Sequence, residues 1–188
     1  MSDSNPPIPD LSKLEIPEAF KEQDVFRLVI RGHAAIEEKI DITIQEAFNG
    51  STPPELRRLP FKARLALFCA LTGIPTRVVA PINALASLRH DFAHGRLDTL
   101  SRERIQGVVV DFADVFPKSS ERLAVLPDPI EVLRLCLVSA DEIINAAGDV
   151  ARARREREKK ALDFEKAVKK LLVEQKKLLA EHAPTPPG

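Results

Sequence analysis

Apolar residues recur at steps of three and four along residues 24–49, which is the spacing of one face of an α-helix. The recurring positions are Phe26, Val29, His33, Ile36, Ile40, Ile44 and Ala47. Asp24 precedes them as a candidate N-cap, and the Asn49-Gly50 pair is typical of a helix end. The pattern therefore predicts a first helix whose apolar face includes a histidine.

The same spacing returns in four later segments. The second helix carries Phe61, Leu65, Phe68 and Leu71 and ends at Gly73, and the third carries Val78, Ile82, Leu85, Leu88 and Phe92, is regular from Pro81 and ends at Gly95. The fourth lies between a Ser101 cap and Pro117 and carries Ile105, Val108, Val109, Phe112 and Phe116. The last begins after Pro129 and carries Ile130, Leu133, Leu137 and Ile144. No segment alternates apolar and polar residues with the period of two that strands show. We therefore predict an all-α fold, an up-and-down bundle of about five helices joined by short Pro/Gly loops.

The last helix meets no breaker between Gly148, a candidate kink, and Pro184. This stretch carries a heptad seam of about three repeats. Its positions are Ala161, Phe164, Val168, Leu171, Gln175 and Leu178, and Leu172 and Leu179 widen it. Two interpretations stay open, a helix packed on its own bundle and a short coiled coil between two chains. A basic amphipathic helix on a membrane is disfavoured, because the stretch lacks the aromatic residues that such helices place in the interface.

These patterns divide the chain into four parts. Residues 1–22 are expected to form a disordered leader with a short turn, 23–147 the helical bundle, 148–182 a basic helical extension, and 183–188 a disordered tail. The formal net charge is zero, but residues 151–182 hold eleven Lys/Arg against six Asp/Glu. The body is therefore mildly acidic and the extension basic, which permits contact with nucleic acid or with an acidic protein without requiring either.

Several function classes lack their sequence signals. No run of eighteen apolar residues predicts a membrane span, and the N-terminus lacks the pattern of a signal peptide, so we expect a cytoplasmic protein. Cys69 and Cys136 lie within apolar helical patterns and are expected to be buried free thiols. The chain shows no zinc spacing, Gly-rich phosphate loop or Ser/His/Asp arrangement, and we expect no metal and no cofactor.

The segment ASLRHDFAHG, residues 86–95, concentrates polar chemistry at the end of the third long helix. Arg89 lies four residues after Leu85 and three before Phe92, so we expect it to point toward the apolar side and to need a carboxylate partner. His94 is five residues further on, roughly 140° around a straight helix. The two side chains converge only if the helix unwinds at Gly95 or if a second chain completes the site. An arginine and a histidine together suit acid–base chemistry on a phosphodiester, because the cation stabilises the phosphorane and the imidazole moves the proton.

The residues Arg89-His90-Asp91-Phe92-Ala93-His94 resemble the arginine, polar residue, short spacer and histidine signature of the HEPN superfamily of helical nucleotide-binding and RNase domains. Together with DVFRLVIRGHAAIEEKID (24–41) and LPFKARLALFCALTG, they also resemble its mannitol-operon-repressor-like branch, over about residues 20–147. The resemblance implies a metal-independent endoribonuclease acting as a homodimer on RNA, in a toxin or phage-defence context, with an antitoxin or regulatory protein as a partner.

Carried over to this sequence, the resemblance implies that Arg89 orients and stabilises the phosphate, that His94 is the general acid/base, and that His90 binds or positions the substrate. Asp91 is a supporting residue. The same superfamily includes proteins that keep the motif without cleaving RNA, so a non-catalytic helical regulator is the alternative.

Two further groups of residues are candidates for the same site. His33 is either a core histidine satisfied by hydrogen bonds or, with Glu37 one turn below, a residue that reaches Arg89, with Glu37 as its carboxylate partner. Glu38 is expected to be solvated. The basic residues Arg57, Arg58, Lys62 and Arg64 form either an exposed helix face or an RNA path.

Overall fold

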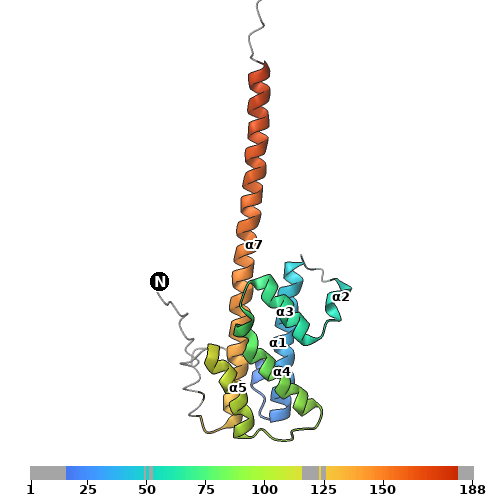
Figure 1. The fold of residues 1–188 in the computed structure, drawn as a ribbon, viewed down its shortest axis with the longest axis vertical. Coiled ribbons are helices and arrows are strands. Elements are labelled where there is room, and N and C mark those ends of the chain that lie inside the picture. Colours follow the sequence, from blue (N-terminus) through green and yellow to red (C-terminus); the bar gives the residue numbers. More distant parts are fainter. Residues whose placement is uncertain (1–15, 49, 51–52, 116–122, 124–125, 182–188) are drawn as a thin grey trace, which may run out of the picture. The chain divides into compact units, whose positions relative to one another are not determined.

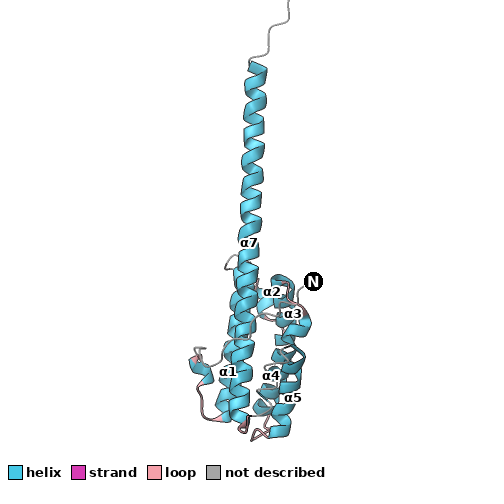
Figure 2. Ribbon diagram, turned by 90° about the vertical axis from the view of Figure 1, so that its left-hand side faces the viewer, coloured by secondary structure: helices cyan, strands magenta, loops and turns pink. Residues whose placement is uncertain are grey.

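The computed structural model describes residues 16–48, 50, 53–115, 123 and 126–181, apart from the side chains of Arg57 and of 173–181. Its helices are the 3-10 turn η2 (Glu18–Phe20), α1 (Val25–Ala47), α2 (Pro54–Arg57), α3 (Phe61–Thr72), the 3-10 turn η3 (Thr76–Val79), α4 (Ala80–Ala93), α5 (Arg102–Val115) and α7 (Pro129–Glu181) (Figure 1). Figure 2 shows no strand in this described part of the chain. The all-α prediction is confirmed, and the short α2 is an element that the sequence pattern did not indicate.

The ends of the helices follow the predicted local signals. Asp24 Oδ1 accepts a hydrogen bond from the Arg27 backbone N–H at 2.8 Å, and Ser101 Oγ accepts one from Arg104 N–H at 3.2 Å. Gly73 ends α3 at φ 77°, in the left-handed region that favours glycine. The positions expected beyond α5 (Phe116 and Pro117), in the leader (1–15) and at the C-terminus (183–188) lie outside the described residues.

The core is formed mainly by the predicted apolar faces. Most predicted positions of α1, α3, α4 and α5 are buried, and so are Leu133, Leu137 and Ile144 of α7. Phe26, however, is 49% exposed. The buried face of α1 includes Leu28, Gly32 and Ile36, so Phe26 lies at the edge of that face in the first turn. Cys69 and Cys136 are buried free thiols, as predicted.

The helix α1 packs against α3 and α4, and α4 packs against α5. On its other side α1 lies against the first part of α7, and Figure 2 shows the two helices side by side. A Cβ added to Gly32 would lie 2.6 Å from Leu137 Cδ1, so glycine permits the close approach. Lys39 Nζ lies 2.6 Å from Asp141 Oδ1 and fixes the same pair of helices further along. These contacts leave one long side of α1 facing α4.

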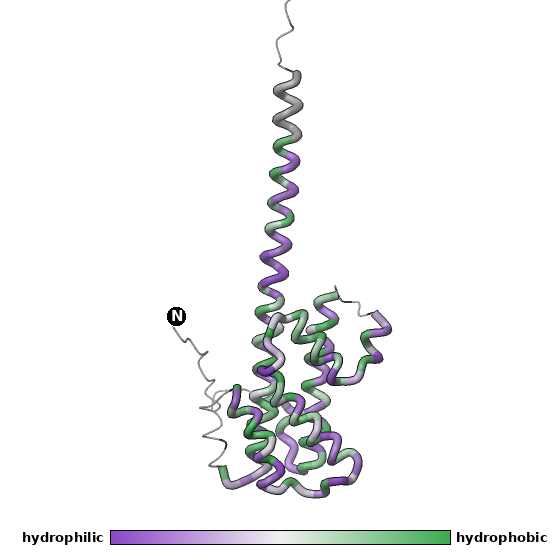
Figure 3. The backbone as a smooth tube through the Cα atoms, in the orientation of Figure 1, coloured by the Kyte–Doolittle hydropathy of each residue, from purple (hydrophilic) through white to green (hydrophobic). Residues whose placement is uncertain are grey.

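The chain divides into two compact units, residues 1–148 and 149–188, and the boundary falls within α7, which continues through Gly148. Residues 149–181 are called the tail below. Hydrophilic and hydrophobic positions alternate along residues 149–172 of the tail (Figure 3), and Phe164, Val168, Leu171 and Leu172 are exposed. No helix among the described residues has the length and apolar character needed to cross a membrane.

Candidate functional site

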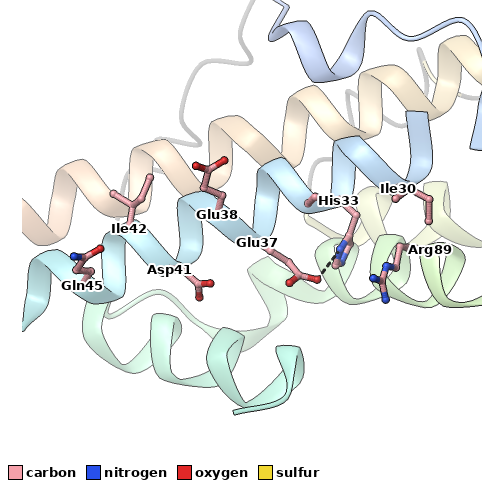
Figure 4. Close-up of a pocket in the computed structure, with 9 residues that line it drawn as sticks. Ile30, His33, Glu37, Glu38, Asp41, Ile42, Gln45 and Arg89 are labelled. Atoms are coloured by element: carbon pink, nitrogen blue, oxygen red, sulfur yellow. Dashed lines mark ion pairs between the residues drawn. The ribbon is translucent and has the colours of Figure 1, made fainter. Parts of the chain in front are cut away.

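A groove of about 510 Å³ runs along α1, and one residue of α4 closes it on the opposite side. Figure 4 labels eight of its lining residues: Ile30, His33, Glu37, Glu38, Asp41, Ile42, Gln45 and Arg89. His33, Glu37, Asp41 and Arg89 point to one side in this view, whereas Glu38 and Ile42 point to the other. The structure therefore brings together three residues that the sequence singled out: His33, Glu37 and Arg89.

The residues His33, Glu37, Asp41 and Arg64 form one ion-paired group, called the paired cluster below. Glu37 Oε1 lies 3.0 Å from His33 Nδ1, and Glu37 Oε2 accepts a hydrogen bond from Arg64 Nη2 at 2.7 Å. Arg64 Nη1 also pairs with Asp41. The contact with His33, together with that from Arg64, lowers the pKa of Glu37 to about 2 against the opposing effect of burial. Glu37 is therefore ionised at any physiological pH.

This pairing corrects two expectations. One of the two alternatives paired Glu37 with Arg89, but Glu37 contacts His33 and forms its ion pair with Arg64. Arg64 was expected on an exposed face or an RNA path, but its side chain is only 15% exposed and is held by two carboxylates. The reason is that α3 packs beside α1 and brings Arg64 to the face that carries Glu37 and Asp41.

His33 is buried at 3% exposure and packs edge-on against Phe61, with 4.7 Å between the ring centroids. Its Nδ1 lies 3.0 Å from Glu37 Oε1 without the alignment of a hydrogen bond, and its Nε2 has no hydrogen-bond partner among the described residues. His33 is thus a core histidine, as one interpretation held, but the hydrogen bonds that would satisfy its ring are incomplete.

Arg89 is exposed, which corrects the expectation that it points inward. The buried face of α4 is formed by Leu85, Leu88 and Phe92, and Arg89 lies at the edge of this face where its long side chain reaches water. No hydrogen bond or ion pair joins it to a residue of the described part of the chain.

His90 and His94 form a ring pair at the end of α4, with centroids 4.2 Å apart and planes tilted by 53°. His94 is the C-cap residue, and Gly95 follows at φ 62°. Desolvation and then the positive charges of His94, Arg96 and Arg89 lower the pKa of His90. Arg89, His90 and His94 are all exposed and are called the unpaired cluster below. His94 does not line the groove that holds Arg89.

Asp91 has partners, in contrast to its neighbours in the motif. Its carboxylate pairs with Arg104 of α5 and lies 3.6 Å from Nη1 of Arg96. The first of these ion pairs joins α4 to α5. Asp91 therefore supports the motif by fixing the end of α4.

The remaining predicted basic residues are divided. Arg58 and Lys62 are exposed, and the side chain of Arg57 lies outside the described residues. Sequence reasoning did not assign Asp41 or Phe61 to the site, where Asp41 pairs with Arg64 and Phe61 packs against His33. The spacing of Glu37 and Asp41, four residues apart on one helix, was a signal that two carboxylates share a face.

Among the residues that the structure describes, no three His, Cys, Asp or Glu side chains are placed to hold a metal ion. Comparison with protein-family models, curated proteins and solved structures finds no match for this chain. The function must therefore be argued from the site itself.

Proposed function

We propose that this protein is a metal-independent endoribonuclease of the HEPN type that acts as a dimer. The observation that carries the proposal is the unpaired cluster. Arg89, His90 and His94 are exposed at the end of one helix, and no hydrogen bond or ion pair of their side chains joins them to the described residues. A cation and two imidazoles held in water without an internal role are suited to an anionic ligand.

The proposed reaction is attack of an RNA 2′-OH on the adjacent phosphorus. The new bond joins the 2′ oxygen to phosphorus and the bond from phosphorus to the 5′ oxygen breaks, which leaves a cyclic phosphate and a 5′-OH. Arg89 neutralises charge on the phosphorane oxygens. A histidine accepts the proton of the 2′-OH, and a protonated imidazole supplies one to the leaving oxygen. His94 has this proton-transfer role, and His90 binds or positions the phosphate.

A second copy of the chain would bring together Arg89 and His94, which one copy keeps apart. Arg89 lines the groove beside α1, whereas His94 contacts His90 and does not line that groove. Two α4 ends facing each other would place the Arg89 of one copy beside the His94 of the other. The proposal therefore includes a composite site across a dimer.

The alternative is a non-catalytic helical regulator in which the motif stabilises the dimer. The same separation of Arg89 from His94 favours it, because a single chain does not assemble the pair. In that case both substitutions weaken association, and neither removes a chemical step.

The deciding experiment measures cleavage of a labelled single-stranded RNA in the presence of a chelator. We compare the wild type with Arg89→Ala and His94→Ala, and with Arg77→Ala as a control at an exposed arginine of η3. Loss of proton transfer or charge stabilisation is expected to slow cleavage by about 10²–10⁴-fold in the first two variants, with the control unchanged. Equal cleavage in all four proteins contradicts the proposal, and lowered dimer affinity without cleavage in any of them identifies the regulator.

A further inference from the structure

The strongest unexplained feature of the fold is the ring of His33. Both of its nitrogens are out of contact with solvent, and Nε2 has no hydrogen-bond partner among the described residues. A buried polar atom without a partner costs free energy of about 1–3 kcal/mol. Leucine or phenylalanine at this position of α1 would avoid that cost, so the histidine needs another explanation.

The surroundings of His33 fix its orientation. Glu37 meets Nδ1 at 3.0 Å, Arg64 holds Glu37 from α3, and the Phe61 ring lies edge-on to the imidazole. An ionised carboxylate at Nδ1 favours a proton on that nitrogen. The other nitrogen, Nε2, is then the one that is left for a ligand.

Arg89 is the second charged group at this end of the groove. It reaches the groove from α4, it points to the same side as His33 in Figure 4, and it has no ion pair with the described residues. The two carboxylates on this side of the groove already have a cation beside them. Arg64 pairs with both Glu37 and Asp41 and offsets one of their two negative charges, and Glu38 points to the other side of α1 in Figure 4.

We infer that His33 and Arg89 form a subsite for a phosphate-class anion in the groove between α1 and α4. Arg89 binds two oxygens of the anion through its guanidinium, and His33 donates one hydrogen bond from Nε2. The rim side chains shift to let an oxygen reach Nε2. In the bound state the His33 ring donates to Glu37 through Nδ1 and to the anion through Nε2. The subsite does not require RNA cleavage.

The test follows the ring nitrogens of His33 by NMR in the full chain labelled with ¹⁵N-histidine. The probe is inorganic sulfate, a dianion that does not titrate near neutral pH. The chain has four histidines, and spectra of His90→Gln, His94→Gln and His182→Gln assign the three other than His33. The remaining resonances belong to His33, so its assignment does not depend on a substitution in the core.

Sulfate is expected to shift the Nε2 resonance of His33 in a saturable way. Arg89→Gln is expected to weaken this binding about tenfold or more, since it removes a charge-assisted bidentate contact. Arg77→Gln, at an exposed arginine away from the groove, is the matched control and is expected to leave the affinity unchanged. An unmoved His33 resonance overturns the inference, and so does an equal loss of affinity in both arginine variants.

Two competitors then identify the source of the anion. Displacement of sulfate by a single-stranded RNA with 2′-O-methyl riboses, which cannot be cleaved, assigns the subsite to a nucleic-acid phosphate. Displacement by uridine 5′-monophosphate alone assigns it to a free nucleotide. A negative sulfate titration overturns the subsite, and a negative cleavage assay overturns the proposed ribonuclease. The two outcomes are distinguishable, because sulfate binding involves no bond cleavage and cleavage is scored without reference to His33.

Discussion

Two polar clusters of the helical body differ in whether their members have partners within the chain. In the paired cluster, two carboxylates hold Arg64, and one of them also contacts His33. In the unpaired cluster, Arg89, His90 and His94 are exposed and have no hydrogen bond or ion pair of their side chains with the described residues. The paired cluster joins α1 to α3, so its charges contribute to stability. The unpaired cluster adds little to stability, and its charges are available to a ligand.

The groove beside α1 is where the two clusters meet. Arg89 belongs to the unpaired cluster and His33 to the paired one, yet both line the same groove. Substitutions in the paired cluster should therefore change mainly the free energy of unfolding, and substitutions in the unpaired cluster mainly ligand binding or cleavage. Substitution of His33 should change both.

The largest effect is expected from a change in the tail that tests whether the unpaired cluster needs a second copy. Leu171 lies on the heptad seam and is 64% exposed, whereas Leu162 lies off the seam and is 50% exposed. If the seam joins two tails in a coiled coil, Leu171→Asp buries a charge in that seam and weakens association by at least about 2 kcal/mol per copy, which is well over tenfold. The matched Leu162→Asp is expected to leave association unchanged.

Sedimentation of the full chain over a range of concentrations measures this difference. RNA cleavage should fall together with the dimer in Leu171→Asp, while sulfate binding at Arg89 stays. Identical sedimentation of both variants and the wild type would show that the seam does not join two chains.

A smaller effect is expected on the free energy of unfolding. Arg64→Gln leaves Glu37 with only His33 beside it, and we expect a loss of about 1–3 kcal/mol. Lys62→Gln, on the same helix at an exposed position, and Arg89→Gln are expected to stay within about 0.5 kcal/mol of the wild type. Urea unfolding followed by circular dichroism measures all three. A loss at Arg89 as large as that at Arg64 would remove the distinction between the two clusters.

The local parts of this architecture could be predicted from sequence, and the partner choices could not. The caps at Asp24 and Ser101 and the end of α3 at Gly73 depend on residues within one turn, so the pattern was sufficient. The partner of Glu37 depends on Arg64, 27 residues away on α3. The periodicity of one helix does not say how α3 packs on α1. For that reason the alternative that gave Glu37 a partner chose Arg89 instead of Arg64.

The same reasoning explains the error at Arg89. Its spacing from Leu85 and Phe92 placed it on the apolar side, but the width of a buried face depends on the neighbouring helices. The burial of His33 was predictable as one of two alternatives, because three of its four neighbours at three and four residues, Val29, Ile30 and Ile36, are apolar. The missing hydrogen-bond partner of Nε2 was not predictable, because it depends on which side chains the neighbouring helices place beside the ring.

The next prediction concerns acid and the paired cluster. The pKa of Glu37 is lowered from 4.5 to about 2 in the folded chain, so its contribution to stability is complete above the unfolded value and is lost as the pH falls through the folded value. The difference in unfolding free energy between the wild type and Glu37→Gln should therefore be constant above about pH 4.5 and shrink toward pH 2. Glu38→Gln is the control, because Glu38 is exposed and its difference from the wild type should change little. A constant difference for Glu37→Gln down to pH 2 would contradict the assigned ion pairs.

The smallest effect is expected within the unpaired cluster, in the titration of His90. Desolvation and the charges of His94, Arg96 and Arg89 lower its pKa from 6.5, so the ring is mostly neutral near neutral pH and can accept a proton or a hydrogen bond. His94→Gln should raise the pKa of His90, and Arg96→Gln and Arg89→Gln should raise it by successively smaller amounts, because the three charges act in that order. Added salt should also raise the pKa of His90, because it screens these positive charges. The NMR titration of His90 measures each shift, with Arg77→Gln expected to cause none. If the arginine substitutions leave the pKa of His90 unchanged, the members of the unpaired cluster do not sense one another's charge, and a shared role for them on one phosphate loses its electrostatic basis.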